Sequence, residues 1–158
     1  MADKAGFLEL SIGEDRSVLA TMSERWRKEG GISKDYTWTK TQKVPVSTLD
    51  DLVSLYGLPK FCKIDVEGFE QQVLKGLSQP IPYLSFEFHK SFLDDAKACM
   101  AHLALLGKPE FNGCFGESME FIFPTWASAS ELLLKIEQST DKDLWGDIYV
   151  KYNLEYNV

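Results

Sequence analysis

Three carboxylates follow a short apolar run in the segment "KFCKIDVEGFEQQVLKGL" at residues 60–77. Asp65, Glu67 and Glu70 fall within six positions there. A carboxylate beside a reacting hydroxyl can act as a general base, and neighbouring acids can divide acid and base roles between them. His89 follows a second apolar run and is a candidate partner, because an imidazole titrates near neutral pH. These residue types suggest a site for proton transfer.

The strands that carry these residues determine whether their side chains lie close together. The runs at residues 61–65 and 83–88 have the length and composition of buried strands. In a parallel α/β sheet, ligands sit beyond the carboxyl ends of the strands. Asp65 ends the first strand and His89 follows the second. If the two strands are neighbours, Asp65, Glu67 and His89 converge on one edge of the sheet, and these three are our candidate catalytic residues.

The same carboxylates also have a purely structural explanation. Asp65 and Glu67 begin a predicted helix at residues 66–75, where acidic side chains cap free N–H groups and favour the positive end of the helix dipole. Glu70 most simply belongs to the surface of that helix, where it can pair with Lys75. Both explanations of Asp65 and Glu67 stay open at this point.

The second strand leaves similar alternatives. His89 can be a hydrogen-bonded residue at a strand end rather than a catalytic one. Phe86 and Phe88 point to the opposite face from Glu87, which therefore shares a face with Ser85. An acid in a central strand needs a partner, so the role of Glu87 is ambiguous.

Hydrophobic periodicity and turn residues predict the other elements. Residues 13–43 are polar, contain a Gly-Gly pair and predict a long loop. Capping patterns mark helix starts at Ser47, with Asp50, and at Ser128, with Glu131. The alternation of helices and strands predicts an α/β fold with a mostly parallel sheet. The predicted strands cover residues 7–12, 61–65, 83–88, 119–123 and 147–152, and the predicted helices cover residues 47–57, 66–75, 91–107 and 128–138.

Length and composition limit the class of protein. The 158 residues suit a single domain over 1–158, with enough apolar residues for a core. The formal net charge of −7 argues against a nucleic-acid partner. No apolar run is long enough to span a membrane, and no secretory signal is seen, so we expect a cytoplasmic protein without a membrane partner. The three widely spaced cysteines predict neither a zinc site nor a disulfide framework.

Four segments together resemble the FkbM-type methyltransferase family. "KIDVEGFEQQVLKG" is similar to the family signature, which is close to K-I-D-V-E-G-x-E-x-x-V-L-x-G. "ADKAGFLELSI" and "VSTLDDLV" resemble upstream segments, and "YLSFEFH" resembles the next strand, which carries an acid and often a histidine. The resemblance extends to about residue 125. It implies a Rossmann-like class I methyltransferase sheet, mostly parallel with an antiparallel C-terminal strand, that binds S-adenosylmethionine for O-methylation of a small molecule or sugar.

The resemblance also implies roles for the candidate residues. Asp65 matches the acid at the end of the strand beside the transferred methyl group, where it orients the substrate or serves as a base. Glu67 matches the second acid of the motif and is expected to hydrogen-bond a substrate or cofactor group. His89 is the expected acid/base partner.

The family's cofactor motif has no counterpart in this sequence. No G-x-G is present, and the only glycine pair lies in the polar segment. We therefore expect a partial sheet, the C-terminal portion of a methyltransferase, and assign no cofactor-binding residues. The strand at residues 61–65 then has an open edge, which is prone to self-association. We expect residues 7–12 or a second copy in a homodimer to cover it.

Two other functions stay open from the sequence. One is a non-catalytic remnant that serves as an oligomeric or binding module. The other is a metal-dependent hydrolase that uses Asp65, Glu67 and His89, since carboxylates can hold magnesium.

Overall fold

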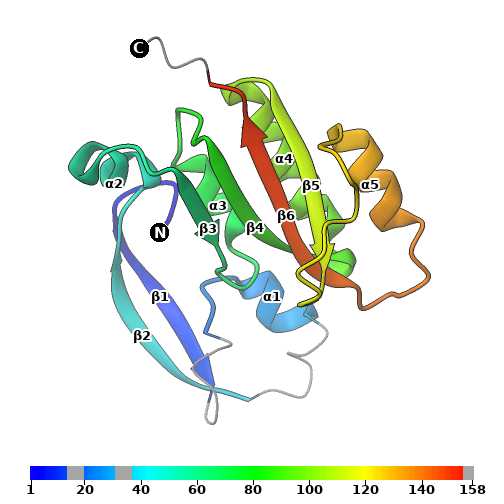
Figure 1. Cartoon of the computed structure of the whole chain (residues 1–158). Helices are drawn as coiled ribbons and strands as arrows, with labels where there is room; N and C mark the ends of the chain where they lie inside the picture. Colours follow the sequence, from blue (N-terminus) through cyan, green and yellow to red (C-terminus); the bar gives the residue numbers. More distant parts are fainter. Residues whose placement is uncertain (14–19, 31–36, 155–158) are drawn as a thin grey trace.

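The predicted site lies on a four-stranded sheet with the order β3-β4-β6-β5 (Figure 1). The structure, a computed structural model, describes residues 1–13, 20–30 and 37–154. β3 pairs in parallel with β4, and β6 pairs antiparallel with both β4 and β5. The four strands are β3 (Phe61–Ile64), β4 (Tyr83–His89), β5 (Pro109–Phe115) and β6 (Trp145–Tyr152).

The protein is therefore a mixed α/β chain, and the predicted sheet is confirmed in part. β3, β4 and β5 run in one direction, and the C-terminal strand β6 is inserted between β4 and β5 in the opposite direction. As predicted, the last strand is antiparallel. The ladders themselves are less parallel than expected, because only β3 and β4 form a parallel pair in the described part of the chain.

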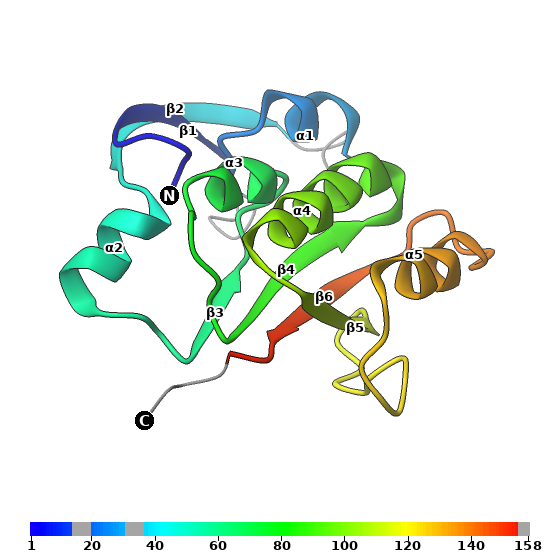
Figure 2. The ribbon, with the colours of Figure 1, turned by 90° about the horizontal axis from the view of Figure 1, so that it is seen from above.

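Two helices cover one face of this sheet and enclose the core (Figure 2). They are α3 (Glu70–Lys75) and α4 (Leu93–Leu106), and a 3-10 turn over Lys90–Phe92 leads into α4. α4 follows the predicted apolar stripe, with Ala96, Cys99 and Leu103 buried against Phe86 and other core residues. α5 (Ala129–Glu137) packs along β5 and starts at the predicted capping box of Ser128 and Glu131. None of the helices in the described ranges is long and apolar enough to cross a membrane.

β1 (Gly6–Gly13) and β2 (Trp38–Val46) form a separate antiparallel pair (Figure 1). The strand predicted at residues 7–12 is confirmed. The long loop predicted at 13–43 is wrong where the structure describes it, because α1 (Glu24–Glu29) and most of β2 lie there; residues 14–19 and 31–36 are outside the described part. β2 has mostly exposed, polar side chains, so it lacks the apolar alternation that reveals a half-buried strand.

The pairing of β1 with β2 also shows whether residues 7–12 cover the open edge of β3, as one of the two expected arrangements requires. β1 lies in its own two-stranded sheet, so the prediction that residues 7–12 cover the edge of β3 is wrong. Among the described residues, β3 forms a ladder with β4 alone.

Two predicted helix starts and one predicted strand need correction. α2 (Leu49–Tyr56) is capped by Thr48 with Asp51, one residue after the predicted pair. α3 begins at Glu70 rather than at residue 66. The strand predicted at residues 119–123 is absent from the described fold, and the fourth strand of the sheet is β5, which pairs with β6. β5 contains proline, glycine and asparagine, which disfavour strands, so its pairing with β6 overrides its intrinsic propensity.

Candidate active site

A turn between β3 and α3 presents the first two candidate acids. β3 ends at Ile64, so Asp65 begins the turn at the carboxyl end of the strand. Glu67 has φ 53° and Gly68 has φ 82°, both in the left-handed region. A non-glycine residue rarely adopts that conformation, and where it does, surrounding contacts must hold it.

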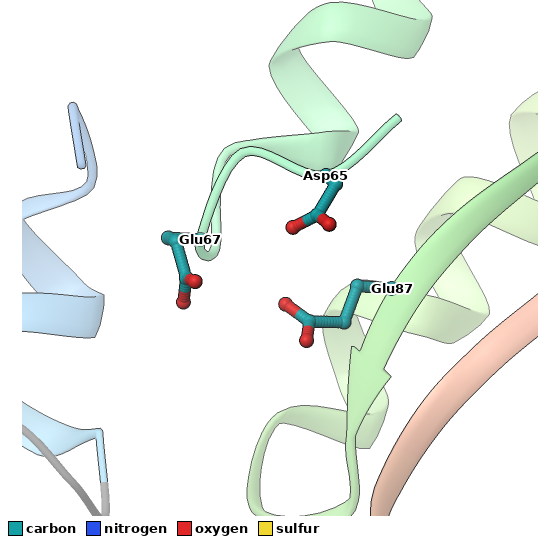
Figure 3. Close-up of side chains that lie close together, drawn as sticks. All are labelled: Asp65, Glu67 and Glu87. Atoms are coloured by element: carbon teal, nitrogen blue, oxygen red, sulfur yellow. The ribbon is translucent and has the colours of Figure 1, made fainter. Parts of the chain in front are cut away.

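The turn brings Asp65 and Glu67 next to Glu87 on β4 (Figure 3). One carboxylate oxygen from each of the three residues lies within 4.8 Å of the others. The parallel register pairs Ile64 with Phe86, which sets Asp65 and Glu87 side by side at the next position. Asp65 and Glu67 therefore lie together as expected, but the third acid of the cluster is Glu87, whose role the sequence leaves ambiguous, and the cluster does not include His89.

Burial and repulsion from neighbouring acids raise the pKa of Glu67. The pKa of Glu67 is raised to about 8, first because the side chain is withdrawn from water and then because Glu87, Asp65 and Glu70 are nearby. Glu67 is therefore mostly protonated at neutral pH and can donate a hydrogen bond. Carboxylates at this spacing suit either a shared proton or a hard cation.

Glu87 carries an unsatisfied acceptor. Its Oε2 atom is buried and has no hydrogen-bond partner among the described residues. The Nε2 atom of His89 lies 3.6 Å from that oxygen, beyond ordinary hydrogen-bond length. Buried polar atoms are nearly always satisfied, so this oxygen, which lies on the His89 side of Glu87, is an unusual feature of the site.

A lysine lies at the other side of the cluster. Lys63 Nζ lies 3.4 Å from Asp65 and 3.5 Å from Asp147 on β6. Burial alone would lower the pKa of Lys63, but Asp147 and Asp65 outweigh it and raise that pKa. Burial also raises the pKa of Asp147. The ammonium group of Lys63 is thus shared between two carboxylates.

These groups line an open cleft of about 630 Å³, a size suited to a small molecule. Five of the lining residues are acidic and one is basic, so the cleft disfavours an anionic ligand. The lining residues are Ala20, Lys63, Asp65, Glu67, Glu87, Cys114, Gly116, Glu117, Met119, Trp145 and Asp147.

His89 lies behind this cleft. Its ring is 4.4 Å from that of Trp26 and 6.3 Å from that of Trp145, measured between centroids. With Glu70 and Glu87 it lines a small separate cavity of about 20 Å³. The structure therefore brings Asp65 and Glu67 together directly, whereas His89 adjoins the cluster through Glu87.

Glu70 differs most from its predicted place. It was predicted on the helix surface beside Lys75, but it is buried, with 8% of its surface exposed. Its Oε1 accepts hydrogen bonds from the backbone N–H groups of Val66, at 3.2 Å, and Gly68, at 3.3 Å. Burial is the largest cause that raises its pKa to about 7. The prediction failed because the helix starts four residues later than expected, which changes the face that Glu70 occupies.

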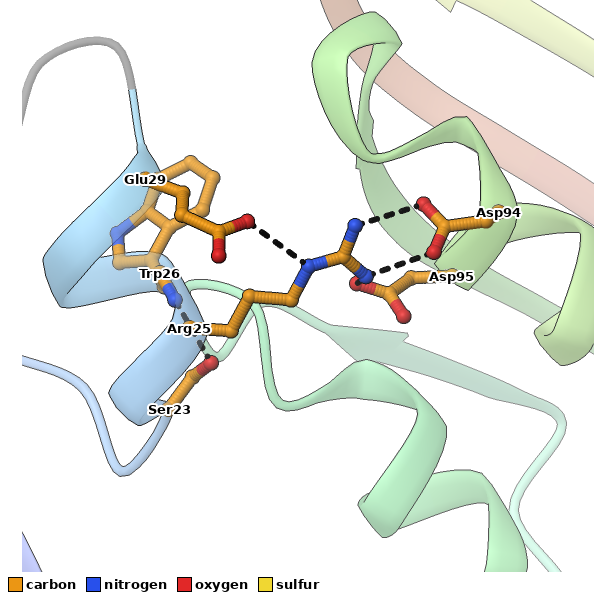
Figure 4. Close-up of polar contacts among 6 residues, drawn as sticks. All are labelled: Ser23, Arg25, Trp26, Glu29, Asp94 and Asp95. Carbon is orange, nitrogen blue, oxygen red and sulfur yellow. Dashed lines mark hydrogen bonds and ion pairs between the residues drawn. The ribbon is translucent and has the colours of Figure 1, made fainter.

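The segment around α1 packs against the outside of the turn. The Thr21 hydroxyl donates to the Glu67 carbonyl at 2.6 Å. A Cβ built on Gly68 would lie 2.8 Å from the Trp26 Cβ, so only glycine allows this approach. α1 is joined to α4 by Arg25, whose guanidinium donates to both oxygens of Asp94, at 2.8 and 3.1 Å (Figure 4).

Figure 4 also shows the other contacts of this junction. Arg25 donates to Asp95 at 3.0 Å and to Glu29 at 3.3 Å, and the Ser23 hydroxyl caps α1 by accepting from the Trp26 N–H. The ion pairs lie at the surface, whereas Trp26 is buried. The indole and the guanidinium therefore fix α1 on the side of the turn.

The methyltransferase FkbM domain matches residues 2–121 of the chain. The chain belongs to the FkbM methyltransferase family. No match to it was found among the curated proteins or among the solved structures. The family predicted from the motif at residues 63–76 is thus confirmed.

The matched range of this FkbM methyltransferase chain contains most of the candidate site. Asp65, Glu67, Glu87 and His89 all lie inside it, as does Glu70. Asp147 lies outside the matched range and reaches the cleft from β6. Its position follows from the insertion of the last strand beside β4, which no local pattern in the sequence reveals.

Proposed function

We propose that this chain acts in S-adenosylmethionine-dependent O-methylation of a small polyhydroxy compound or sugar. Family membership supports methyl transfer. The observation that carries the proposal is the convergence of Asp65, Glu67 and Glu87 on a cleft of small-molecule size. An acidic cleft favours a neutral or cationic substrate over a phosphorylated one.

The three acids divide the chemistry in this proposal. Asp65 is about half exposed and faces the cleft, so it orients the acceptor hydroxyl and takes its proton on a carboxylate oxygen. The ammonium group of Lys63 forms an ion pair with Asp65 and helps to hold its carboxylate in place. Glu67 is protonated at neutral pH and donates a hydrogen bond to a substrate oxygen. The ring of His89 lies beside Glu87, with its Nε2 atom 3.6 Å from Glu87 Oε2, and helps to hold that carboxylate in place.

The residues present fit the charge of the cofactor. When bound, S-adenosylmethionine supplies an electrophilic methyl group on a positively charged sulfur. Glu87 and its register partner Asp147 both line the cleft, and their carboxylates are acceptors suited to a positively charged or hydrogen-donating group. Glu87 and Asp147 would therefore hold the charged end of the cofactor. No residues are assigned to its adenosine end, since the chain contains no G-x-G turn.

A methyl-transfer assay tests this function. The full chain is incubated with S-adenosylmethionine that carries a labelled methyl group and with a panel of sugars and polyols. We expect transfer by the unaltered chain and by Glu120→Gln, an exposed control outside the cleft lining. We expect Asp65→Asn to lower the rate by about 100-fold, as for loss of a general base. Equal rates in Asp65→Asn and the control would contradict the assigned role.

We also propose that the outer edge of β3 pairs with a second copy of the chain. β3 forms a ladder on one side only in the described residues, and an open edge offers unpaired backbone groups to another strand. Phe61 on β3 is half exposed, and its register partner Tyr83 is exposed too. Their apolar surface would be buried in such a pairing.

A further inference from the structure

The proposed acid Glu67 depends on a backbone conformation that the chain must stabilise. Glu67 and Gly68 both have positive φ, and Glu67 has no glycine-like freedom to adopt it. The conformation of such a residue persists when neighbouring groups fix the peptide units on either side of it. The contacts around Glu67 therefore show what holds its side chain at the cleft.

One peptide unit of the turn is held at both ends. The carbonyl of Glu67 accepts from the Thr21 hydroxyl at 2.6 Å, and the N–H of the same peptide, on Gly68, donates to Glu70 Oε1 at 3.3 Å. The same Glu70 oxygen accepts from the Val66 N–H at 3.2 Å. A rotation of the Glu67–Gly68 peptide would break two of these bonds. Its plane sets ψ of Glu67 and φ of Gly68, and with them the direction of the Glu67 carboxyl.

Glu70 makes these contacts from a buried position below the turn. It is the first residue of α3, and its side chain turns back to the turn that precedes the helix. It also lines the 20 Å³ cavity together with Glu87 and His89, a space large enough for one water molecule. Glu70 therefore lies between the turn that carries Glu67 and the strand that carries Glu87.

We infer that Glu70 is a positioning residue, whose buried carboxylate fixes the Glu67–Gly68 peptide and thereby holds Glu67 against Asp65 and Glu87. The role in catalysis rests on the proposed methyl transfer, but the role in fixing the turn does not. Glu70 does not line the cleft, and its hydrogen bonds go to the backbone of the turn, so it acts through the backbone. The hydroxyl of Thr21 completes the same arrangement from the opposite side.

The test compares two substitutions of similar size. Glu70→Gln keeps a carbonyl oxygen that can accept both N–H groups, whereas Glu70→Leu removes the acceptor. Val73→Ala is the matched control, because Val73 is buried on the same helix and makes no contact in this network. Amide hydrogen exchange of Val66 and Gly68 is measured by NMR in the full chain, relative to amides in β4.

We expect Glu70→Leu to speed exchange at Gly68 and Val66 by at least tenfold relative to β4, and Glu70→Gln and Val73→Ala to leave that ratio unchanged. Once methyl transfer is measurable, Glu70→Leu should lower kcat by about 100-fold, the effect of a displaced catalytic group, with little change in KM. Equal protection of the turn in Glu70→Leu and Glu70→Gln would overturn the inference.

A second variant tests the same contact if Glu70→Leu does not fold. Thr21→Val removes the hydroxyl at the other end of the same peptide, and we expect it to speed exchange at Gly68 as well. Unchanged protection in Thr21→Val would show that the peptide is not held in this way. If the unaltered chain transfers no methyl group, the proposed function fails while the exchange data still decide the role of Glu70.

Discussion

The substitution Glu67→Gln should make the protein less sensitive to a rise in pH. Glu67 has an ordinary pKa of 4.5 when unfolded and a pKa of about 8 in the folded chain, because of burial and the nearby Glu87, Asp65 and Glu70. A glutamine has nearly the same shape but cannot lose a proton. The variant therefore removes the cost of ionising this position.

The sign and size of the effect follow from proton linkage. Between pH 4.5 and about 8 the folded state binds more protons at Glu67 than the unfolded state does, so the free energy of unfolding falls as the pH rises through this window. One pKa unit corresponds to about 1.36 kcal/mol. Since Glu67 is partly open to solvent, which screens its repulsion, we expect a loss of about 1–2 kcal/mol from Glu67 between pH 5 and pH 8.

Urea unfolding at pH 5, 6, 7 and 8 measures this difference. Glu70 and Asp147 also have raised pKa values, but they are present in both proteins and largely cancel in the comparison. Glu120→Gln is the control for loss of an exposed carboxylate. We expect the unaltered chain and the control to lose about 1–2 kcal/mol more than Glu67→Gln over this range. Parallel stability curves for all three proteins would refute the assignment of a half-buried, protonated Glu67.

Three further perturbations test the scaffold. Gly68→Ala should destabilise the chain by about 2 kcal/mol or more in urea unfolding, because alanine is strained at φ 82° and meets the Trp26 Cβ; a change below about 0.5 kcal/mol would contradict this packing. Arg25→Lys should lower stability by about 1 kcal/mol or less, with a smaller difference at high salt, because lysine cannot form the two-point bond to Asp94; a salt-independent loss would exclude this electrostatic cause. Phe61→Lys should shift sedimentation from dimer to monomer by placing charge at the open edge of β3, and a monomeric unaltered chain would remove the proposed self-association.

Sequence patterns predicted the centre of the site because local rules govern it. The apolar run at residues 61–65 and the acid that follows it place Asp65 at a strand end, and the parallel β3–β4 pair brings that end beside β4. Glu87 could have been included from strand alternation alone, since it shares a face with His89. Its place in a central strand makes it an ambiguous candidate in the sequence, and only the structure shows that it lies beside Asp65 and Glu67.

The errors arose where tertiary contacts outweigh local patterns. The sequence pattern predicts a helix from residue 66 and therefore places Glu70 on the helix surface. In the structure the turn continues to Phe69, so a different side of α3 is buried and Glu70 lies on it. β2 and β5 were missed because polar residues dominate the first and glycine, proline and asparagine interrupt the second. Asp147 reaches the cleft only through the position of β6 between β4 and β5, a pairing across a long stretch of chain.

Calorimetric titration of the full chain with S-adenosylmethionine tests the central claim most directly. If the cleft of Asp65, Glu67 and Glu87 serves methyl transfer, the unaltered chain should give a saturable heat of binding. Glu87→Gln should weaken binding by tenfold or more, because it removes a negative charge from the cleft lining, while Glu120→Gln should bind as the unaltered chain does. No heat of binding at millimolar cofactor, or equal affinity in Glu87→Gln and the unaltered chain, would contradict the account.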